Sequence, residues 1–249
     1  MLEKLPSPLI IAHRGYRARF PENTLAAFRG ALEIGAPMIE LDAALSRDRQ
    51  VVVIHDRTVD RTTDGRGRVA DLTLAELKSL DAGGWYDPRF AGERVPTLAE
   101  VLDLMGGSAA VNIEIKPEAH ESHEPGDAIE FQVMALIRSR KAMARILVSS
   151  FEPGVLIRMS KLESPPALGV LTDKTVDKKI VELCRQVNAF SWNPDHRYLS
   201  PEAVARMHRA GVRVLPYTVN SRRKMDELLA IGVDGLFTDD PRLLPQFLR

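Results

Sequence analysis

The chain has 249 residues and lacks several features that would restrict its function. It contains a single cysteine, Cys184, so no disulfide can form within the chain. Lys plus Arg and Asp plus Glu both total 34. A zero net charge argues against nucleic acid as the main partner, because a phosphate backbone requires a basic excess. The rest of the composition, 45% hydrophobic and 27% charged, is that of an ordinary globular protein.

Long apolar runs are also missing. The longest that we find, residues 9–12, 51–54 and 146–148, are far below the roughly 20 residues that a membrane-spanning helix needs. The apolar segment before His13 is also too short for a secretory signal peptide. We therefore expect a soluble, cytoplasmic protein with no stable membrane insertion.

Short β-branched runs alternate with longer helical stretches, which is typical of parallel α/β folds. The predicted strands are residues 9–12, 38–42, 111–115, 146–150, 168–171, 189–192, 212–217 and 235–238. The helices predicted most clearly are residues 24–34, 128–140, 201–210 and 222–230. Eight such units in a chain of about 250 residues favour a closed barrel. We predict an α/β fold, a (β/α)8 TIM barrel, as one domain over residues 1–249.

One segment breaks the alternation and distorts the predicted barrel. Residues 51–54 follow the second strand too closely for a helical crossover, which needs about a dozen residues, so a hairpin fits better. A turn at Asp48 and Arg49 would put Asp42 opposite His55, on a shared face. This pairing would bring His55 to the barrel mouth. A Gly-, Asp- and Arg-rich stretch with a short helix at 74–80 follows, so we predict an insertion at about residues 43–94.

Charged side chains gather at the carboxyl ends of the first strands, which is where the active site of a (β/α)8 barrel lies. Seven candidate residues fall there: His13, Arg14, Glu40, Asp42, His55, Glu114 and Lys116. Residues two apart on a strand share a face, so the candidates from each strand should point together. Three convergent carboxylates suit a hard divalent cation such as Mg²⁺ or Ca²⁺, and nothing is spaced for zinc.

The other members of this set suit phosphate chemistry. Arg14 and Lys116 beside a metal would bind a phosphate, and two histidines could act as general acid and general base. Any one of these residues alone could be a solvated loop charge. Three unpaired carboxylates, however, would be costly to bury together without a cation.

Several residues of the same types are expected to serve structure. His120 and His123 are predicted to lie in a polar loop after Pro117, and His196 and His208 at surface or interface positions. Asp239 and Asp240 should cap the turn after the last strand, although Asp239 lies at the catalytic end of the barrel. Trp85 lies in the insertion, where it lines the mouth or only packs against it.

The sequence resembles the bacterial glycerophosphodiester phosphodiesterase family. The matching segments are AHRG, PENTLAAF, MIELDAALSRD, VVVIHDRTVDRTT, NIEIKP, SSFEP, PYTVN and GVDGLFTDDP. They extend from residue 12 to residue 241, so the resemblance covers essentially the whole chain, and their combination is highly specific. The chain is most similar to the short cytoplasmic members of the family.

The resemblance implies a role for each matching residue. It makes His13 and His55 the catalytic acid and base pair, and it associates Arg14 and Lys116 with the phosphate. It makes Glu40, Asp42 and Glu114 the metal ligands. Tyr217 stands where many members have Trp, and would form a wall for the glycerol or alcohol group. Two departures from the family pattern are Arg49, in place of the usual hairpin Gly, and the bulky basic segment 17–20.

The resemblance therefore implies metal-dependent hydrolysis of small-molecule glycerophosphodiesters, the deacylated phospholipids, to glycerol 3-phosphate and an alcohol. Mg²⁺ and Ca²⁺ are the expected cofactors, with Mn²⁺ as a further alternative. The nucleophile is either water or the glycerol 2-hydroxyl, and the roles of the two histidines stay open. The alternatives are a lysophospholipase D and a non-catalytic barrel that binds polyol phosphates. Head-group preference and oligomeric state are left open.

Overall fold

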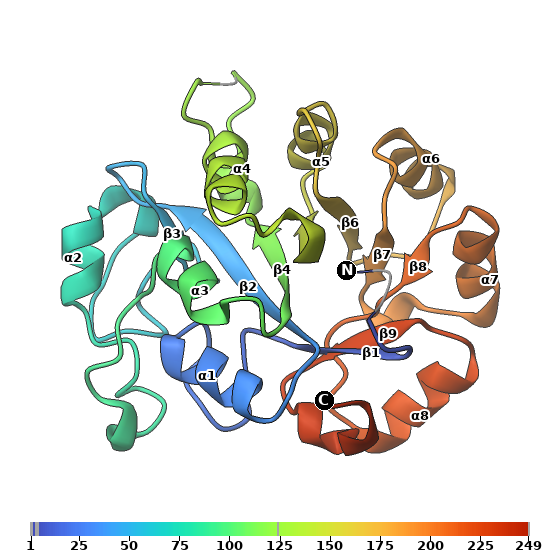
Figure 1. Ribbon diagram of the computed structural model, residues 1–249, viewed down its shortest axis with the longest axis horizontal. Helices are drawn as coiled ribbons and strands as arrows, with labels where there is room; N and C mark the ends of the chain where they lie inside the picture. Colours follow the sequence, from blue (N-terminus) through green and yellow to red (C-terminus); the bar gives the residue numbers. More distant parts are fainter. Residues whose placement is uncertain (1, 3–4, 124, 249) are drawn as a thin grey trace.

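A computed structural model describes residues 2, 5–123 and 125–248. Eight parallel strands follow the order β8–β7–β6–β5–β4–β2–β1–β9. Figure 1 shows the neighbouring pairs β2–β4 and β1–β9 side by side. They are β1 Leu9–Ala12, β2 Met38–Leu45, β4 Ala110–Ile115, β5 Ile146–Ser150, β6 Ala167–Thr172, β7 Ser191–Pro194, β8 Arg213–Val214 and β9 Gly235–Thr238. Backbone hydrogen bonds of 3.0 Å from Asp234 to Val214 and from Phe237 to Pro216 join β9 to the chain at β8. The predicted (β/α)8 barrel is confirmed.

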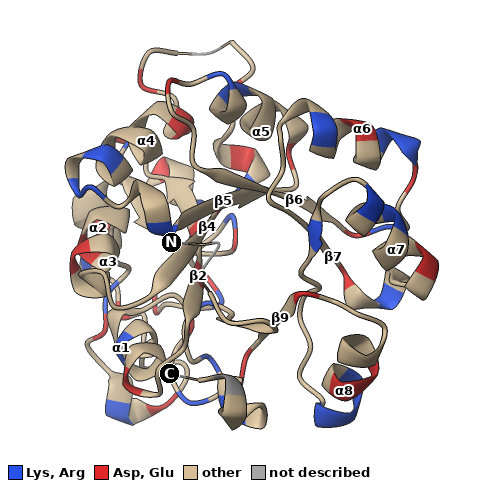
Figure 2. Cartoon of the chain, turned by 45° about the vertical axis from the view of Figure 1, so that its right-hand side comes forward, with Lys and Arg blue, Asp and Glu red and all other residues tan. Residues whose placement is uncertain are grey.

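The helices form a ring outside these strands and carry many of the charged side chains (Figure 2). They are α1 Leu25–Glu33, α3 Leu98–Met105, α4 Ile129–Ser139, α5 Pro153–Ser160, α6 Lys178–Gln186, α7 Pro201–Arg209 and α8 Arg222–Ala230, with α2 Leu74–Ser79 in the insertion. After β9 the chain forms the 3-10 turns Pro241–Leu243 and Pro245–Phe247. Within the described residues, no helix has both the length and the apolar character needed to cross a bilayer.

Two of the predicted strands are shortened or displaced in the structure for local reasons. The predicted strand 212–217 is regular only over Arg213–Val214, because Pro216 has no N–H to donate. The chain nevertheless stays beside β7, and Tyr217 N donates to Pro194 O at 2.9 Å. The strand predicted at 189–192 begins at Ser191, because Ala189 N still donates to Cys184 O at the end of α6.

The predicted hairpin exists, but its register is wrong by one residue. Strand β3, Val51–Val53, pairs with β2 so that Ala43 faces Val53, and Ile54 N donates to Asp42 O at 3.0 Å. Asp42 therefore lies opposite Ile54, not His55. The turn has three residues, not two, because Ser46 N bonds to Gln50 O and Arg49 takes a φ of 62°. A three-residue hairpin turn typically ends in such a left-handed residue.

The segment between β3 and α3 has a small core of its own. Apolar side chains from the hairpin and from this segment form the cluster: Ala44, Val52, Ile54, Val59, Val69, Leu77, Ala82 and Val95. Helix α2 begins with a capping box in which Thr73 accepts from Glu76 N and Glu76 accepts from Thr73 N. In Figure 1 this segment stands beside β2 at the left of the barrel. The core fixes the hairpin that ends at His55.

The inner face of the barrel changes from apolar to charged along the strands. Its amino-terminal end is filled by a cluster that includes Leu9, Met38, Ala110, Leu215 and Phe237. Side chains two apart on a strand share a face. The same inner face therefore continues to the following residues near the carboxyl ends: His13, Glu40, Asp42, Glu114, Lys116, Tyr217 and Asp239.

Candidate active site

Three buried carboxylates meet at the carboxyl ends of β2 and β4. Glu40, Asp42 and Glu114 each offer an oxygen, and these oxygens lie within 4.8 Å of one another. The strands are direct neighbours, and Asp42 pairs with Glu114 in the ladder. The side chains of the set are at most 11% exposed. The sequence-based expectation that these three converge is thus met in the structure.

Two basic side chains partly neutralise this carboxylate cluster. Lys116 Nζ lies 2.6 Å from Glu114 Oε1 and 3.4 Å from Asp42 Oδ1. Arg14 Nε lies 3.3 Å from Asp42 Oδ2, and Arg14 N donates to Glu40 Oε2 at 2.8 Å. Arg14 has a φ of 54°, which turns its backbone N–H and its side chain toward the same group of carboxylates.

The pKa values of the three carboxyl groups are driven apart. Burial, with the charges of Asp42 and Glu114, raises the pKa of Glu40 well above its ordinary value. Burial and then Asp42 raise the pKa of Glu114 to about 7. Burial also acts to raise the pKa of Asp42, but the charges of Arg14 and Lys116 outweigh it and bring this pKa well below the ordinary value. Three ionised carboxylates here would outnumber the two basic side chains beside them, and an all-oxygen donor set of this kind fits a hard divalent cation.

Each of the two candidate histidines is held by its own carboxylate. His13 Nδ1 lies 2.7 Å from Asp239 Oδ1, and His55 Nδ1 lies 2.7 Å from Asp56 Oδ1. A carboxylate accepts and does not donate, so Nδ1 carries the proton and Nε2 is left for proton exchange. Burial is the largest influence on both rings and lowers the pKa of His13 and of His55 below the ordinary value.

Although the predicted hairpin register is wrong by one residue, His55 still lies in this region. His55 follows Ile54 by one residue, and its charge and that of Asp42 each shift the pKa of the other. The side chain of His55 is 33% exposed, compared with 12% for His13. The structure thus brings seven of the expected residues together at one end of the barrel.

Tyr217, the eighth expected residue, lies at the same end but is fixed by other contacts. Its hydroxyl donates to Thr172 O at 3.0 Å, and its ring packs edge-on against Phe151 at a centroid distance of 5.8 Å. Burial raises the pKa of its hydroxyl. The pair of rings provides an apolar wall beside a charged site.

Four residues near the site were not predicted from the sequence: Arg17, Glu22, Asn23 and Arg61. Asn23 Nδ2 donates to Asp42 Oδ2 at 2.8 Å, and Glu22 receives three arginines. Both belong to the PENT segment directly before α1, and the only signal in the sequence was that this segment is one of those matching the family. Asp239 was placed at the catalytic end, and its bond to His13 now gives it a partner there.

The other histidines considered lie elsewhere. His120 Nδ1 is 2.6 Å from the fully buried Glu130, which Arg158 also contacts at 3.0 Å. His208 Nε2 is 2.9 Å from Asp234. Trp85 is 39% exposed and donates to Ala82 O, so it belongs to the packing of the insertion.

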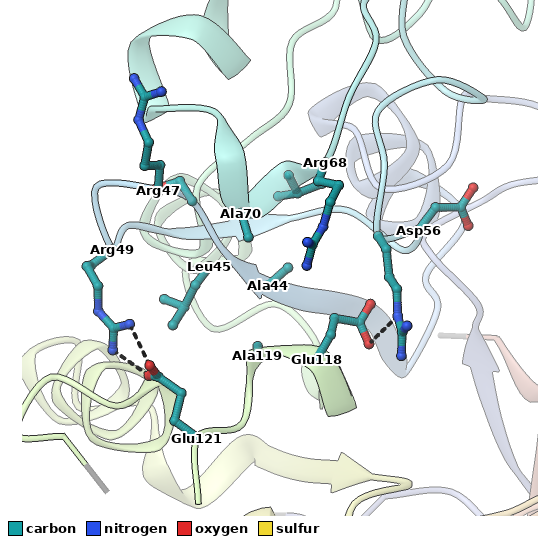
Figure 3. Close-up of a pocket in the computed structure, with 13 residues that line it drawn as sticks. Ala44, Leu45, Arg47, Arg49, Asp56, Arg68, Ala70, Glu118, Ala119 and Glu121 are labelled. Carbon is teal, nitrogen blue, oxygen red and sulfur yellow. Dashed lines mark hydrogen bonds and ion pairs between the residues drawn. The ribbon is translucent and has the colours of Figure 1, made fainter. Parts of the chain in front are cut away.

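A pocket of about 200 Å³ lies beside the hairpin, next to the residue that holds His55 (Figure 3). Asp56 and Arg57 line one end of it, where Arg57 lies 3.7 Å from Glu118. At the other end Arg49 pairs with Glu121 at 2.7 Å. Its walls are formed by chain neighbours of the expected site residues, not by those residues themselves. The pocket is therefore separate from the carboxylate cluster.

Comparison with known proteins decides the family. A model of the glycerophosphoryl diester phosphodiesterase family matches residues 13–243. The chain belongs to this family. It is 41% identical to a glycerophosphodiester phosphodiesterase of Caldanaerobacter subterraneus subsp. tengcongensis, over 97% of this chain and 98% of that one.

Solved structures of the family agree with the fold. A phosphodiesterase of Oleispira antarctica, in complex with the product sn-glycerol-3-phosphate, is 28% identical with a TM-score of 0.85. The match covers 99% of this chain and 98% of that one. A glycerophosphodiester phosphodiesterase of Agrobacterium tumefaciens is 29% identical with a TM-score of 0.80, covering 96% and 99%. The chain is thus an enzyme, a hydrolase of glycerophosphodiesters.

Proposed function

We propose that the chain hydrolyses glycerophosphodiesters to glycerol 3-phosphate and an alcohol, with a divalent cation at Glu40, Asp42 and Glu114. The observation that carries this proposal is the convergence of three buried carboxylates with two basic side chains at the mouth of the barrel. The donors are oxygens alone, which favours Mg²⁺, Ca²⁺ or Mn²⁺ over zinc. When bound, the cation would offset negative charge on the phosphoryl group.

The chain's own residues supply binding and proton transfer. Arg14 and Lys116 would bind the phosphodiester, which is a monoanion, through charge-assisted hydrogen bonds. One of His13 and His55 would remove the proton of the nucleophile, and the other would protonate the departing alkoxide. Their Nδ1 atoms are occupied by Asp239 and Asp56, so Nε2 would act in both cases. Tyr217 and Phe151 would contact the carbon skeleton of the glycerol or alcohol group.

The test is release of glycerol 3-phosphate from glycerophosphocholine, measured by a coupled dehydrogenase assay. The wild type should be active, should lose activity on chelation and should regain it with Mg²⁺, Ca²⁺ or Mn²⁺. His13→Ala and His55→Ala should each lower kcat about 10²–10⁴-fold, the usual worth of general acid–base catalysis, with a smaller change in KM.

The control is His208→Ala, which removes a histidine–carboxylate pair away from the site and should leave kcat unchanged. Lysophosphatidylcholine serves as the comparison substrate for a lysophospholipase D. Full turnover in metal-free protein, or near wild-type kcat in either site variant, would contradict the proposal. A barrel that only binds polyol phosphates would show no turnover with any of the metals.

A further inference from the structure

A chain of ion pairs extends from His13 into the loop after β1. His13 Nδ1 bonds to Asp239 at 2.7 Å, and Arg17 Nη1 lies 3.4 Å from Asp239 Oδ2. The same guanidinium reaches further, with its Nε 2.9 Å from Glu22 Oε2. Arg17 thus links the carboxylate that holds His13 to Glu22. We call this the His13 arm.

A second chain of the same composition extends from His55 to the same residue. His55 Nδ1 bonds to Asp56 at 2.7 Å, and Arg61 Nε lies 2.6 Å from Asp56 Oδ2. Arg61 is also bidentate to Glu22, with contacts of 2.7 Å to Oε1 and 3.0 Å to Oε2. In this His55 arm, as in the other, one carboxylate and one arginine stand between the imidazole and Glu22.

Glu22 is built to receive both arms. Its side chain is 1% exposed, and a third arginine, Arg14, contacts Oε1 at 2.7 Å. Although burial acts to raise it, the bonds and charges of Arg61, Arg14 and Arg17 lower its pKa to about 2. Glu22 is therefore ionised at neutral pH, among three guanidinium groups.

The backbone places Glu22 there by closing the loop on itself. Asn23 N donates to Arg14 O at 3.1 Å, and both residues take positive φ values, 57° and 54°. Residues other than Gly seldom adopt this conformation, so the loop geometry is specific. It brings Glu22 next to Arg14 and between Arg17 and Arg61.

We propose that Glu22 is a positioning residue that holds both histidines at once, through the His13 arm and the His55 arm. The proposal rests on the acid–base roles given to the two histidines under the proposed function. A carboxylate on Nδ1 fixes the tautomer and the ring orientation of a histidine. The planar fork of an arginine in turn fixes the carboxylate. Glu22 anchors both forks, so one side chain sets the orientation of the acid and of the base.

The arms are tested by double-mutant cycles on kcat with glycerophosphocholine. Asp239→Asn should lower kcat by between about 10-fold and 10⁴-fold, the range for carboxylates that hold a functional histidine. In a His13→Ala background, Asp239→Asn should lower kcat no further. In a His55→Ala background, it should lower kcat by the same factor as in the wild type. Asp56→Asn should show the reverse pattern. Equal losses in both backgrounds would overturn the assignment of the arms.

Glu22 is tested by Glu22→Gln, which keeps the shape of the side chain and removes its charge. We expect kcat to fall about 10-fold or more, with a smaller change in KM. ¹⁵N correlation spectra of the imidazoles should show that both His13 and His55 lose the pure Nδ1–H tautomer. If both tautomers and kcat stay unchanged, the proposal is wrong.

Two further variants keep this test decisive. Arg61→Lys keeps the charge but loses the bidentate fork. It should therefore change the tautomer of His55 and leave that of His13 unchanged. An effect on both rings would contradict the assignment of two separate arms. It also serves if Glu22→Gln does not fold. Glu130→Gln is the matched control, because Glu130 is another buried glutamate with an arginine and a histidine, and it should keep kcat.

Failure of this proposal and failure of the proposed function would look different. Near wild-type turnover in His13→Ala or His55→Ala would remove the acid–base roles and with them this proposal. Low turnover in both histidine variants, with unchanged tautomers and kcat in Glu22→Gln, would remove only the role of Glu22.

Discussion

The low pKa of Glu22 makes a quantitative prediction about stability. Its carboxyl group titrates at about 2 in the folded chain, compared with an ordinary value of 4.5. At 1.36 kcal/mol for each pKa unit, the ionised group stabilises the fold by about 3 kcal/mol at neutral pH. The side chain is 1% exposed, so solvent screening does not reduce this figure much. Glu22→Gln should lose this contribution.

The sign of the effect follows from the direction of the pKa shift. A carboxyl group with a depressed folded-state pKa stabilises the fold above its unfolded pKa, and this stabilisation is lost as the pH falls through the folded pKa. The gap in unfolding free energy between wild type and Glu22→Gln should therefore be largest at pH 7. It should start to shrink near pH 4.5 and approach zero near pH 2.

Urea unfolding followed by circular dichroism, with a chelator present at every pH, measures this gap. Ile137→Val is the control, because it removes one methylene from a fully buried helical side chain and should cost about 1 kcal/mol at each pH. A gap for Glu22→Gln that stays constant with pH, or grows as the pH falls, would refute the electrostatic account of Glu22.

Three other predictions concern the site and the core. In metal-free protein at pH 8, Glu114→Gln should raise the Tm in a thermal-shift assay, because burial and Asp42 raise the Glu114 pKa to about 7 and disfavour its charged form. With saturating Mg²⁺ the same substitution should lower the Tm relative to wild type, because it removes a ligand of the bound ion. Tyr217→Ala should raise KM for glycerophosphocholine several-fold, while Tyr217→Phe, which keeps the ring against Phe151, should stay near wild type. Burial raises the pKa of Cys184 to about 12, so a thiol reagent at pH 8 should label it only after unfolding in urea.

The strand ends could be predicted because the rule behind them is local. Side chains on a strand alternate between faces, so an apolar inner residue such as Met38 fixes Glu40 and Asp42 as inner residues too. Parallel strands then bring their carboxyl ends to one side of the barrel. The carboxylate cluster follows from these two rules, and neither depends on details of packing.

The hairpin register depended on turn chemistry that the pattern of apolar residues does not contain. The hydroxyl of Ser46 accepts from Gln50 N at 2.9 Å and donates to Asp48 at 2.6 Å, which favours a turn of three residues. Arg49 occupies the left-handed position that glycine usually takes, and its guanidinium pairs with Glu121 and Asp127. Those partners are more than 70 residues away in the chain, so tertiary contacts help to decide a local conformation.

The ion pairs around Glu22 could not be predicted from the sequence, for a different reason. Asp239 meets His13 only because β9 pairs with β1 when the barrel closes, with His13 N bonded to Thr238 O at 2.9 Å. Arg61 reaches Glu22 only because the insertion folds back after the hairpin. Charge type and spacing along the chain carry no sign of either contact.

The ion pairs around Glu22 and the carboxylate cluster form one connected set of charges at the mouth of the barrel. Six carboxylates are linked here, five by ion pairs and Glu40 by a hydrogen bond from the backbone N–H of Arg14: Glu22, Glu40, Asp42, Asp56, Glu114 and Asp239. Four basic side chains are linked to them: Arg14, Arg17, Arg61 and Lys116. The set therefore has two negative charges in excess when every carboxylate is ionised, which agrees with the raised pKa values of Glu40 and Glu114.

A divalent cation would remove this excess, and all six carboxylates could then stay ionised. One protonated histidine would add a positive charge and the phosphodiester a negative one, so the reactive complex would again be neutral. Neutrality matters here because an isolated charge is costly to bury. With Glu22→Gln the same complex would carry one uncompensated positive charge, which disfavours a protonated imidazole. On the proposed mechanism, Glu22 would therefore support the acid in two ways, through the geometry of the arms and through the charge of the set.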